Sequence, residues 1–339
     1  MIRTEEELDE LLSRPSEVDI AAAAALNGDI LLLGAGGKMG PSLARLARRA
    51  ANHAQRKRRI IVVARFSHKQ LAAEFEANEI EAIACDLLQP GALSQLPDSE
   101  NVVFMAARKF GTSGSEAFTW AINTHLPGLV AERFRKSRIV AFSTGNVYGL
   151  RAATEGGATE SSPVAPAGEY AQSALGRERM FEYGSSQWGT AVTILRLNYA
   201  VELRYGVLVD VALSVYERRA IDLGMGLVNV IWQKDANSAC LSSFAHCQSP
   251  PLILNITGPE TLSVRYIAEE FGRRFAIEPI FNSIETSSAL LNNAAKSHLL
   301  FGYPTVRPAQ IMDWIADWIL AGGSLLDKPT HFEAQDGKF

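Results

Sequence analysis

The stretch that decides the fold runs from Leu31 to Gly40 and reads Leu-Leu-Leu-Gly-Ala-Gly-Gly-Lys-Met-Gly. A short apolar run ends at Gly34, which permits a tight turn, and a helical pattern begins directly after the stretch. Gly36 and Gly37 allow a pyrophosphate to approach the backbone, and Gly40 allows a helix to pack closely on a strand. The stretch therefore predicts a strand–turn–helix unit that binds a dinucleotide.

A phosphate loop of the nucleoside-triphosphatase type is the alternative for such a turn. Leu32 occupies the position of its first glycine, and Met39 occupies the position of the serine or threonine that reaches magnesium. These two mismatches disfavour nucleoside triphosphate chemistry.

Short apolar runs alternate with amphipathic helical patterns downstream of the turn. Runs that are apolar on both faces are typical of a parallel sheet covered by helices. The predicted strands are Ile30–Leu33, Ile60–Ala64, Ile80–Ala84, Val102–Ala106, Ile139–Phe142, Val192–Leu197 and Leu252–Ile256. The predicted helices between them are Pro41–Ala54, His68–Ala77, Ser115–Lys136 and Tyr170–Gln187. The expected fold class is α/β, a doubly wound parallel sheet of the Rossmann type.

The pattern also predicts how the chain is divided. A helical extension precedes the sheet, the strand–helix alternation forms a dinucleotide-binding domain, and a smaller, mostly helical substrate domain and a polar tail follow. The expected boundaries are 1–28, 29–199 with a returning strand near 251–257, 200–330 and 331–339. Within the extension, Thr4 and Glu7 resemble a capping box, which predicts a short amphipathic helix over residues 4–13.

Composition excludes several classes of protein. With 339 residues, 47% of them hydrophobic, the chain can bury one large core or two smaller ones, so disorder is excluded as its main state. The formal net charge of −4 offers no basic excess for nucleic acid. No apolar run is long enough to span a membrane, and the six histidines show no metal-ligand spacing.

The compartment is predicted from the cysteines and the N-terminus. Cys85, Cys240 and Cys247 are sparse and odd in number, which favours a reducing compartment. Acidic residues at Glu5 to Glu7 stand where an export signal needs basic ones. We therefore expect a cytoplasmic protein.

The end of the second strand predicts which dinucleotide is bound. An acidic residue there accepts a hydrogen bond from a free ribose 2′-hydroxyl, whereas basic residues hold a 2′-phosphate. No acid follows Ala64, and Arg65, Ser67 and Lys69 can together bind a phosphate. An exposed arginine at a solvated helix start is the alternative. NADP is preferred over NAD in this interpretation.

Several motifs occur in an order that resembles the extended short-chain dehydrogenase/reductase family, the NAD-dependent epimerase/dehydratase group. The resemblance covers about residues 29–320 and rests on Gly34-x-x-Gly37-x-x-Gly40, Cys85-Asp86-Leu87, Met105-Ala106-Ala107, Asn123, Phe142–Gly149, Arg196-Leu197-Asn198, Asn255–Gly258, Ala295-Lys296 and Leu300–Pro304.

This resemblance implies an enzyme with a defined catalytic pair. Thr144 matches the catalytic serine or threonine, and Tyr170 matches the tyrosine of the family's Tyr-x-x-x-Lys motif. The Thr144 hydroxyl can hold a substrate oxygen while the Tyr170 phenol transfers a proton as a hydride moves. The expected cofactor-binding residues are Gly34, Gly36, Gly37, Lys38, Met39, Gly40, Arg65, Ser67, Asp86, Leu87, Ala106, Ala107, Arg108 and Asn123. The expected substrate residues are Asn146, Arg196 and Asn198.

The sequence departs from the family at Ala174, which occupies the position of the motif's lysine. In the family that lysine binds the nicotinamide ribose and places a positive charge near the tyrosine. A free tyrosine has a pKa of about 10, so without a cation about 0.1% of it is phenolate at pH 7. Oxidation, which needs the tyrosine as a base, is therefore impaired more than reduction, and we expect NADPH-type reduction of a sugar-like substrate.

Two alternatives stay open at this point. Arg177 or the Arg108-Lys109 pair can replace the missing cation, or Arg177 is an exposed helix charge that pairs with a neighbouring glutamate. A catalytically impaired dinucleotide-binding protein, acting as a structural or redox-sensing module, is the alternative function. By analogy with the family, we expect a homodimer that pairs through the helices predicted at Ser115–Lys136 and Tyr170–Gln187.

Overall fold

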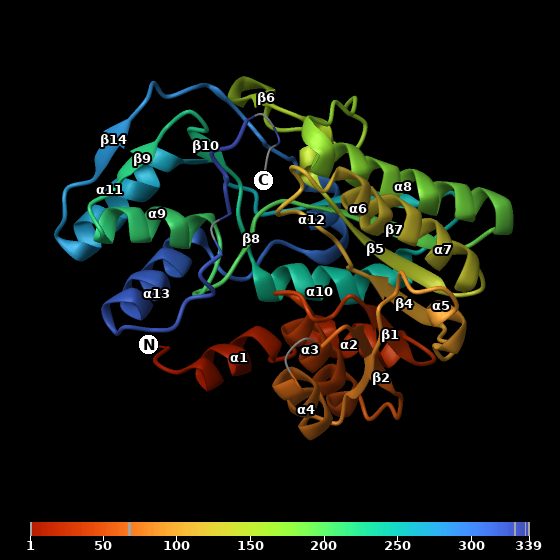
Figure 1. Ribbon diagram of the computed structural model, residues 1–339. Coiled ribbons are helices and arrows are strands. Elements are labelled where there is room, and N and C mark those ends of the chain that lie inside the picture. Colours follow the sequence, from red (N-terminus) through yellow and green to blue (C-terminus); the bar gives the residue numbers. More distant parts are fainter. Residues whose placement is uncertain (1, 67–68, 329, 336, 338–339) are drawn as a thin grey trace.

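The computed structural model describes residues 2–66, 69–328, 330–335 and 337. Its centre is a sheet of seven parallel strands in the order β12-β7-β5-β4-β1-β2-β3 (Figure 1). These strands are β1 (Ile30–Leu33), β2 (Ile60–Ala64), β3 (Glu81–Ala84), β4 (Asn101–Phe104), β5 (Arg138–Thr144), β7 (Val192–Leu197) and β12 (Leu252–Ile256). The chain winds outward from β1 in both directions, so the predicted doubly wound sheet is confirmed.

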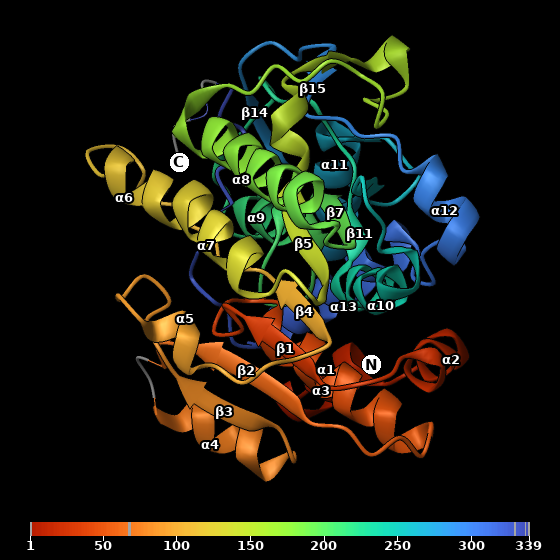
Figure 2. The same cartoon turned by 90° about the vertical axis from the view of Figure 1, so that its right-hand side faces the viewer.

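Helices bury both faces of the sheet. Leu32 and Val62 pack towards α3 (Gly40–His53) and α10 (Gln233–Ser243). Leu33 belongs to the core on the opposite face, towards α7 (Leu126–Arg133) and α8 (Gly168–Trp188). Figure 2 shows α7 and α8 on one side of the sheet and α10 on the other. Alternate residues of each strand therefore belong to different cores, which explains why these strands are apolar throughout.

A second core lies beside the sheet in the C-terminal part of the chain. It is built by α9 (Val207–Tyr216), α11 (Val264–Phe275) and α13 (Pro308–Leu320), with Phe271 and Trp318 fully buried among them. This unit confirms the smaller, mostly helical C-terminal domain.

The remaining elements are short. The helices are α4 (Lys69–Ala77), α5 (Ala92–Gln95) and α12 (Ala295–Phe301), with 3-10 turns η2 (Gly145–Tyr148), η3 (Ala153–Glu155) and η4 (Phe244–His246). The strands form two-stranded pairs, namely β6 (Arg151–Ala152) with β15 (Ser288–Ala289), β8 (Ala200–Val201) with β11 (Ile231–Trp232), β9 (Ala220–Asp222) with β14 (Ile280–Asn282), and β10 (Leu227–Val228) with β13 (Leu262–Ser263).

The N-terminal extension contacts both units. Helix α1 (Glu5–Ser13) begins at Thr4, whose side chain accepts a hydrogen bond from the Glu7 backbone N–H. Its apolar residues Leu8 and Leu12 are fully buried in the second core. The other residues of this core come from segments that lie much later in the sequence. Helix α2 (Glu17–Ala25) packs on α3 and α10, which α1 also contacts. The extension thus spans the junction between the two units.

The helix predicted as one element at Ser115–Lys136 is interrupted in the structure. It consists of α6 (Glu116–Trp120), a π-helical turn η1 (Ala121–His125) and α7. The turn contains Asn123, which is fully buried and hydrogen-bonded to the loop after β4. A widened turn lets one side chain leave the regular helix face, and such turns are common at functional sites.

Two absences concern only the part of the chain that the structure describes. None of its helices is long and apolar enough to cross a membrane. No group of three or more histidine, cysteine, aspartate or glutamate side chains is placed to hold a metal ion.

Candidate active site

The glycine-rich turn has the geometry that a dinucleotide requires. Gly34 has a φ of +93°, and a Cβ at this position would collide with the backbone of Ala106. A Cβ at Gly40 would collide with the carbonyl of Ala35, so helix α3 begins directly against the turn. Close approach of a ligand to the backbone and to the helix N-terminus depends on these positions.

A recess of about 400 Å³ lies at the carboxyl ends of β1 to β4, next to the turn. Predicted residues that follow the ends of β2, β3 and β4 line this recess. They are Arg65, Asp86, Leu87, Ala106 and Ala107. Arg65 is exposed. Ser67 lies outside the described residues, and only the backbone of Lys69 is described.

A larger cleft of about 1550 Å³ opens on the other side of the turn, between the sheet and the second core. Gly34, Gly36 and Gly37 line both the recess and this cleft. An elongated dinucleotide that crosses the turn would therefore place one half in each space. Lys38 and Met39 also line the cleft.

The structure brings most of the predicted chemical groups into this cleft. Thr144 ends β5, and its hydroxyl accepts a hydrogen bond from the Asn146 backbone N–H at 3.2 Å. Tyr170 lies in the first turn of α8, and Asn198 donates its side-chain N–H to the Leu290 carbonyl at 3.0 Å. Thr144, Asn146, Tyr170 and Asn198 all line the cleft.

Ala174 follows Tyr170 by one turn of α8 and is fully buried. It forms a small apolar cluster with Val147, Tyr148 and Ala158. Its surroundings therefore suit a methyl group.

Arg177 is a buried cation in the same cleft. Its Nη1 donates to the Phe142 carbonyl at 2.7 Å and its Nη2 donates to Asn123 Oδ1 at 3.0 Å. Only 3% of the residue is exposed, and burial lowers the pKa of Arg177. The alternative of an exposed helix charge paired with Glu178 or Glu182 is therefore wrong, because Arg177 is buried, Glu178 binds Arg196 and Glu182 binds Arg179.

Arg196, predicted as a cleft residue, is instead the partner of Glu178. Its Nε and Nη2 donate to the two carboxylate oxygens at 2.9 and 2.6 Å, and both residues are buried. Ser143 donates its hydroxyl to the same carboxylate at 2.5 Å. Burial alone lowers the pKa of Arg196, but the hydrogen bonds and charge of Glu178 outweigh burial and raise it. A guanidinium on a central strand needs such a partner, which removes Arg196 from the cleft.

The side chains of Asn123 and Arg108 form hydrogen bonds with backbone groups. Asn123 accepts from the Arg108 N–H and donates to the Arg108 carbonyl, both at 2.9 Å, and it also donates to Ser173 Oγ at 3.0 Å. It therefore ties the loop after β4 to α8. The Arg108 guanidinium turns back to the Gly111 carbonyl at 2.6 Å.

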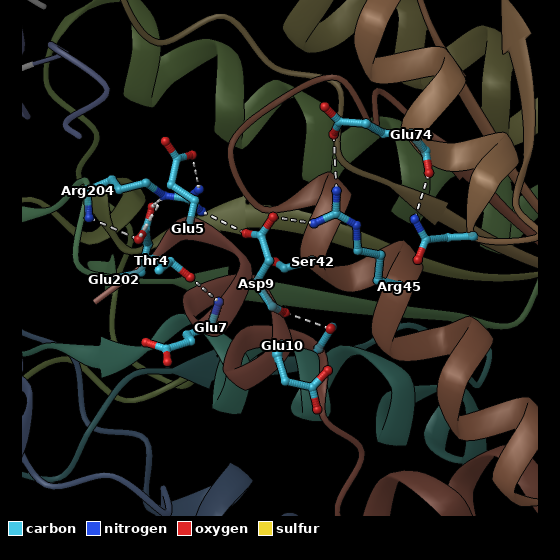
Figure 3. A network of polar contacts seen from close by, with 12 residues as sticks. Thr4, Glu5, Glu7, Asp9, Glu10, Ser42, Arg45, Glu74, Glu202 and Arg204 are labelled. Carbon is cyan, nitrogen blue, oxygen red and sulfur yellow. Dashed lines mark hydrogen bonds and ion pairs between the residues drawn. The ribbon is translucent and has the colours of Figure 1, made fainter. Parts of the chain in front are cut away.

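The N-terminal helix forms one wall of the cleft, with Glu5, Glu6 and Asp9 in its lining. Figure 3 shows Asp9 between Arg45 of α3 and Arg204, a residue between β8 and α9. The Asp9 carboxylate binds Arg45 Nη1 at 2.6 Å and Arg204 Nη2 at 3.2 Å. One side chain of the extension thus bridges the two units across the cleft.

Several cleft residues were not predicted. Tyr199 and Tyr205 enter the cleft from the segment between β7 and α9, and burial raises the pKa of both phenols. The acidic residues of α1 enter from the other wall. These side chains belong to no motif, and only the tertiary arrangement brings them to the turn.

Comparisons with known proteins agree with this arrangement. Residues 30–201 match the NAD dependent epimerase/dehydratase family. The fold is similar to UDP-glucuronic acid 4-epimerase from Bacillus cereus in complex with NAD, with 18% identity over 86% of this chain and 96% of that chain and a TM-score of 0.72. It is also similar to UDP-glucose 4-epimerase from Thermotoga maritima with UDP-glucose, with 15% identity over 87% of this chain and 99% of that chain and a TM-score of 0.71.

The search of curated protein sequences found no match. The family match spans just over half of the chain and includes the glycine-rich turn, Thr144 and Tyr170. The chain therefore belongs to the NAD dependent epimerase/dehydratase family, a family of enzymes that use a nicotinamide dinucleotide.

Proposed function

We propose that the protein transfers a hydride between a nicotinamide dinucleotide and a carbonyl or hydroxyl carbon of a sugar-like substrate. The observation that carries this proposal is that Thr144 and Tyr170 line the same cleft as Gly34 and Gly37. A hydroxyl and a phenol beside the cofactor turn are the groups that hydride transfer at a C–O bond requires.

The two side chains divide the work on the substrate oxygen. When bound, the dinucleotide supplies the hydride in reduction and takes it up in oxidation. In reduction, the carbonyl carbon gains the hydride and the oxygen gains the Tyr170 proton, which gives an alcohol and a tyrosinate. The Thr144 hydroxyl donates a hydrogen bond to the same oxygen and orients it. Tyr170 then regains a proton from water.

Reduction is the direction that these residues favour. The position one turn after Tyr170 holds the methyl of Ala174, so no ammonium is present there to stabilise a tyrosinate. The neutral phenol is the proton donor in reduction, whereas oxidation starts from the charged form.

NADP is the preferred cofactor in this proposal. The residue that follows β2 is Arg65, not an acid, and it is exposed at the rim of the recess. We expect NADPH to bind more tightly than NADH in calorimetric titrations. Arg65→Ala should lower NADPH affinity about tenfold, the loss of one charge-assisted phosphate contact. NADH affinity serves as the control and should stay unchanged.

The substrate is proposed to be a sugar nucleotide. The two epimerases compared above act on UDP-sugars, as their names state. In this chain the cleft continues into a second recess of about 500 Å³, and both are lined by Arg204, Tyr205 and Lys328. The combined space supports an elongated ligand with its sugar near Tyr170 and its nucleotide in the second recess.

We also propose that the protein is a homodimer. The surface of α6 to α8 carries large exposed apolar side chains, namely Phe118, Trp120, Leu129, Tyr183 and Trp188. Such a set is typical of an interface between copies. Sedimentation should give twice the mass of the chain, and Tyr183→Glu should give the monomer.

A cytoplasmic location is the corresponding proposal for the compartment. Cys85, Cys240 and Cys247 are all free thiols in the structure. Burial raises the pKa of Cys247 to about 11, so it carries little thiolate at neutral pH.

Activity of the Tyr170→Phe variant tests the function. We expect NADPH oxidation with a panel of 4-keto and 6-aldehydo sugar nucleotides to fall at least 100-fold, because the proton donor is lost. Tyr266→Phe, exposed on α11 and outside both the cleft and the proposed dimer surface, is the matched control and should retain full activity. Tight cofactor binding with no turnover of any substrate would favour the dinucleotide-binding module instead.

A further inference from the structure

Helix α1 is attached to a different unit towards each of its ends. Near its start, the Glu5 carboxylate accepts a hydrogen bond from Ser324 Oγ at 2.8 Å and lies 3.3 Å from Arg204 Nη1, and both partners adjoin residues of the second core. Nearer its end, the two carboxylate oxygens of Glu10 accept from Nη1 and Nη2 of Arg49 in α3, each at 2.7 Å. The helix therefore extends from one unit to the other.

The middle of α1 combines ionic and apolar contacts. Asp9 is paired with Arg45 of the first unit and with Arg204 of the second (Figure 3). The two arginine side chains are 14% and 15% exposed, so water and salt screen these pairs only in part. The buried leucines of α1, Leu8 and Leu12, belong to the second core. The attachment to the second unit thus consists of two leucines and a small set of polar contacts.

Helix α2 is fixed to the first unit independently of α1. Asp19 of α2 is fully buried and pairs with Lys234 of α10 at 2.9 Å. Residues 14–16 connect the two helices, and α1 has nine residues, a length at which a helix is marginal without tertiary contacts. Segments with few buried apolar contacts open at a lower free energy than the rest of the fold. Helix α1 can therefore leave the second unit while α2 stays in place.

The helix lies beside the place where a dinucleotide is expected. Glu6 and Asp9 line the same cleft as Gly37 and Ser42. Ser42 belongs to the first turn of α3, and the N-terminus of such a helix is where a pyrophosphate binds. A dinucleotide held by the glycine-rich turn would therefore have α1 as one side of its site.

We propose that α1 is a strap across the cleft, which releases the second unit when the dinucleotide enters or leaves and closes the side of the cleft while the dinucleotide is bound. This inference rests on the proposed function only for the presence of a dinucleotide in the cleft. It adds a conformational step that hydride transfer itself does not require. Because a ligand shifts such an equilibrium only by binding one form more tightly, bound dinucleotide should favour the closed strap.

Hydrogen exchange followed by mass spectrometry tests this shift. The free protein is compared with protein saturated with NADPH or NADH, whichever binds more tightly. We expect the backbone amides of residues 5–13 to exchange about tenfold more slowly when the dinucleotide is bound. The amides of α2 should change little, because Asp19 anchors that helix in both forms. Equal exchange of residues 5–13 in the two samples would overturn the inference.

The rate of dinucleotide release tests the step directly. Loaded protein is mixed with an excess of the oxidised dinucleotide, and the fluorescence of the bound reduced form is followed by stopped flow. Asp9→Ala removes ion pairs to both units and should raise the rate constant of release about fivefold. Glu5→Gln weakens only the attachment to the second unit and should raise it about twofold. Glu7→Gln is the matched control, because this carboxylate accepts from the Arg3 backbone N–H within the extension, and it should release the dinucleotide like the wild type.

A merely structural role of α1 would give a different result. Asp9→Ala would then lower Tm and leave the rate of release unchanged, and this combination would overturn the inference. Thermal melting checks that each variant is folded. If Asp9→Ala does not fold, Glu5→Gln decides, and an unchanged rate in that variant counts against the strap. The proposed function fails separately, since full activity of Tyr170→Phe would refute the proton donor without altering the rates of release.

Discussion

Replacing Glu178 by glutamine removes one charge from a buried ion pair and leaves the other in place. Glu178 is fully buried, and its carboxylate accepts three hydrogen bonds, from Ser143 at 2.5 Å and from Arg196 at 2.9 and 2.6 Å. A glutamine amide offers one acceptor, and its N–H groups face the guanidinium donors. The Arg196 charge would then be buried without compensation.

The expected loss follows from this geometry. Removing one partner of a buried pair lowers the free energy of unfolding by about 3–5 kcal/mol. With an unfolding entropy of about 2.1 cal/mol/K per residue, a chain of 339 residues loses about 1.4 °C of Tm for each kcal/mol. We therefore expect Glu178→Gln to lower Tm by about 4–7 °C. Activity should fall as well, because Ser143 directly precedes Thr144.

Two matched variants decide whether this reasoning holds. Glu182→Gln, on the same helix, breaks the exposed pair with Arg179 and should change Tm by about 1 °C or less. The double variant Glu178→Gln/Arg196→Met removes both charges and should be more stable than Glu178→Gln alone. Differential scanning calorimetry measures all three. The reasoning is refuted if Glu178→Gln has the same Tm as Glu182→Gln, or if the double variant has the lowest Tm of the three.

Leu12→Ala should lower the free energy of unfolding by about 2–5 kcal/mol, measured by urea denaturation, because this fully buried side chain of α1 fills the second core. An effect below 1 kcal/mol would mean that α1 is not docked in solution. Ala174→Lys should lower Tm and restore no activity, because a long cationic side chain would enter the apolar cluster around Tyr148; a gain in oxidation rate would contradict this. For Lys38 the folded-state pKa of about 7 lies below the unfolded value of about 10.4, so the unfolded chain binds more protons between them. The wild type should therefore gain stability relative to Lys38→Met as pH rises from 7 to 9, and parallel Tm profiles would speak against it.

Much of the fold was predictable because it depends on local pattern. The strands of the central sheet are apolar throughout, and the run Leu31–Gly40 gives the position and direction of the first crossover. Thr144 and Tyr170 are placed by their order after β5 and at the start of α8, and both enter the cleft.

The partners of charged side chains were not predictable in the same way. Arg177 and Arg196 are both arginines near apolar residues in the sequence, yet one lines the cleft and the other lies in a sealed ion pair. The difference depends on Glu178, which faces β7 and binds Arg196 because α8 packs on that side of the sheet. Likewise, Lys38 is adjacent to Tyr205 only after the second unit has packed against the turn.

The position of α1 has a consequence for the order of assembly during synthesis. The helix leaves the ribosome first, but Leu8 and Leu12 belong to the core that α9, α11 and α13 complete, and α13 ends at Leu320. The sheet can close once β12 is made, at Ile256, whereas α1 must wait for a further stretch of chain before its apolar face is covered. Contacts of such large sequence separation form late. The cleft wall that α1 provides is therefore completed only after the sheet, so a nascent chain can acquire its glycine-rich turn before the cleft beside it is closed.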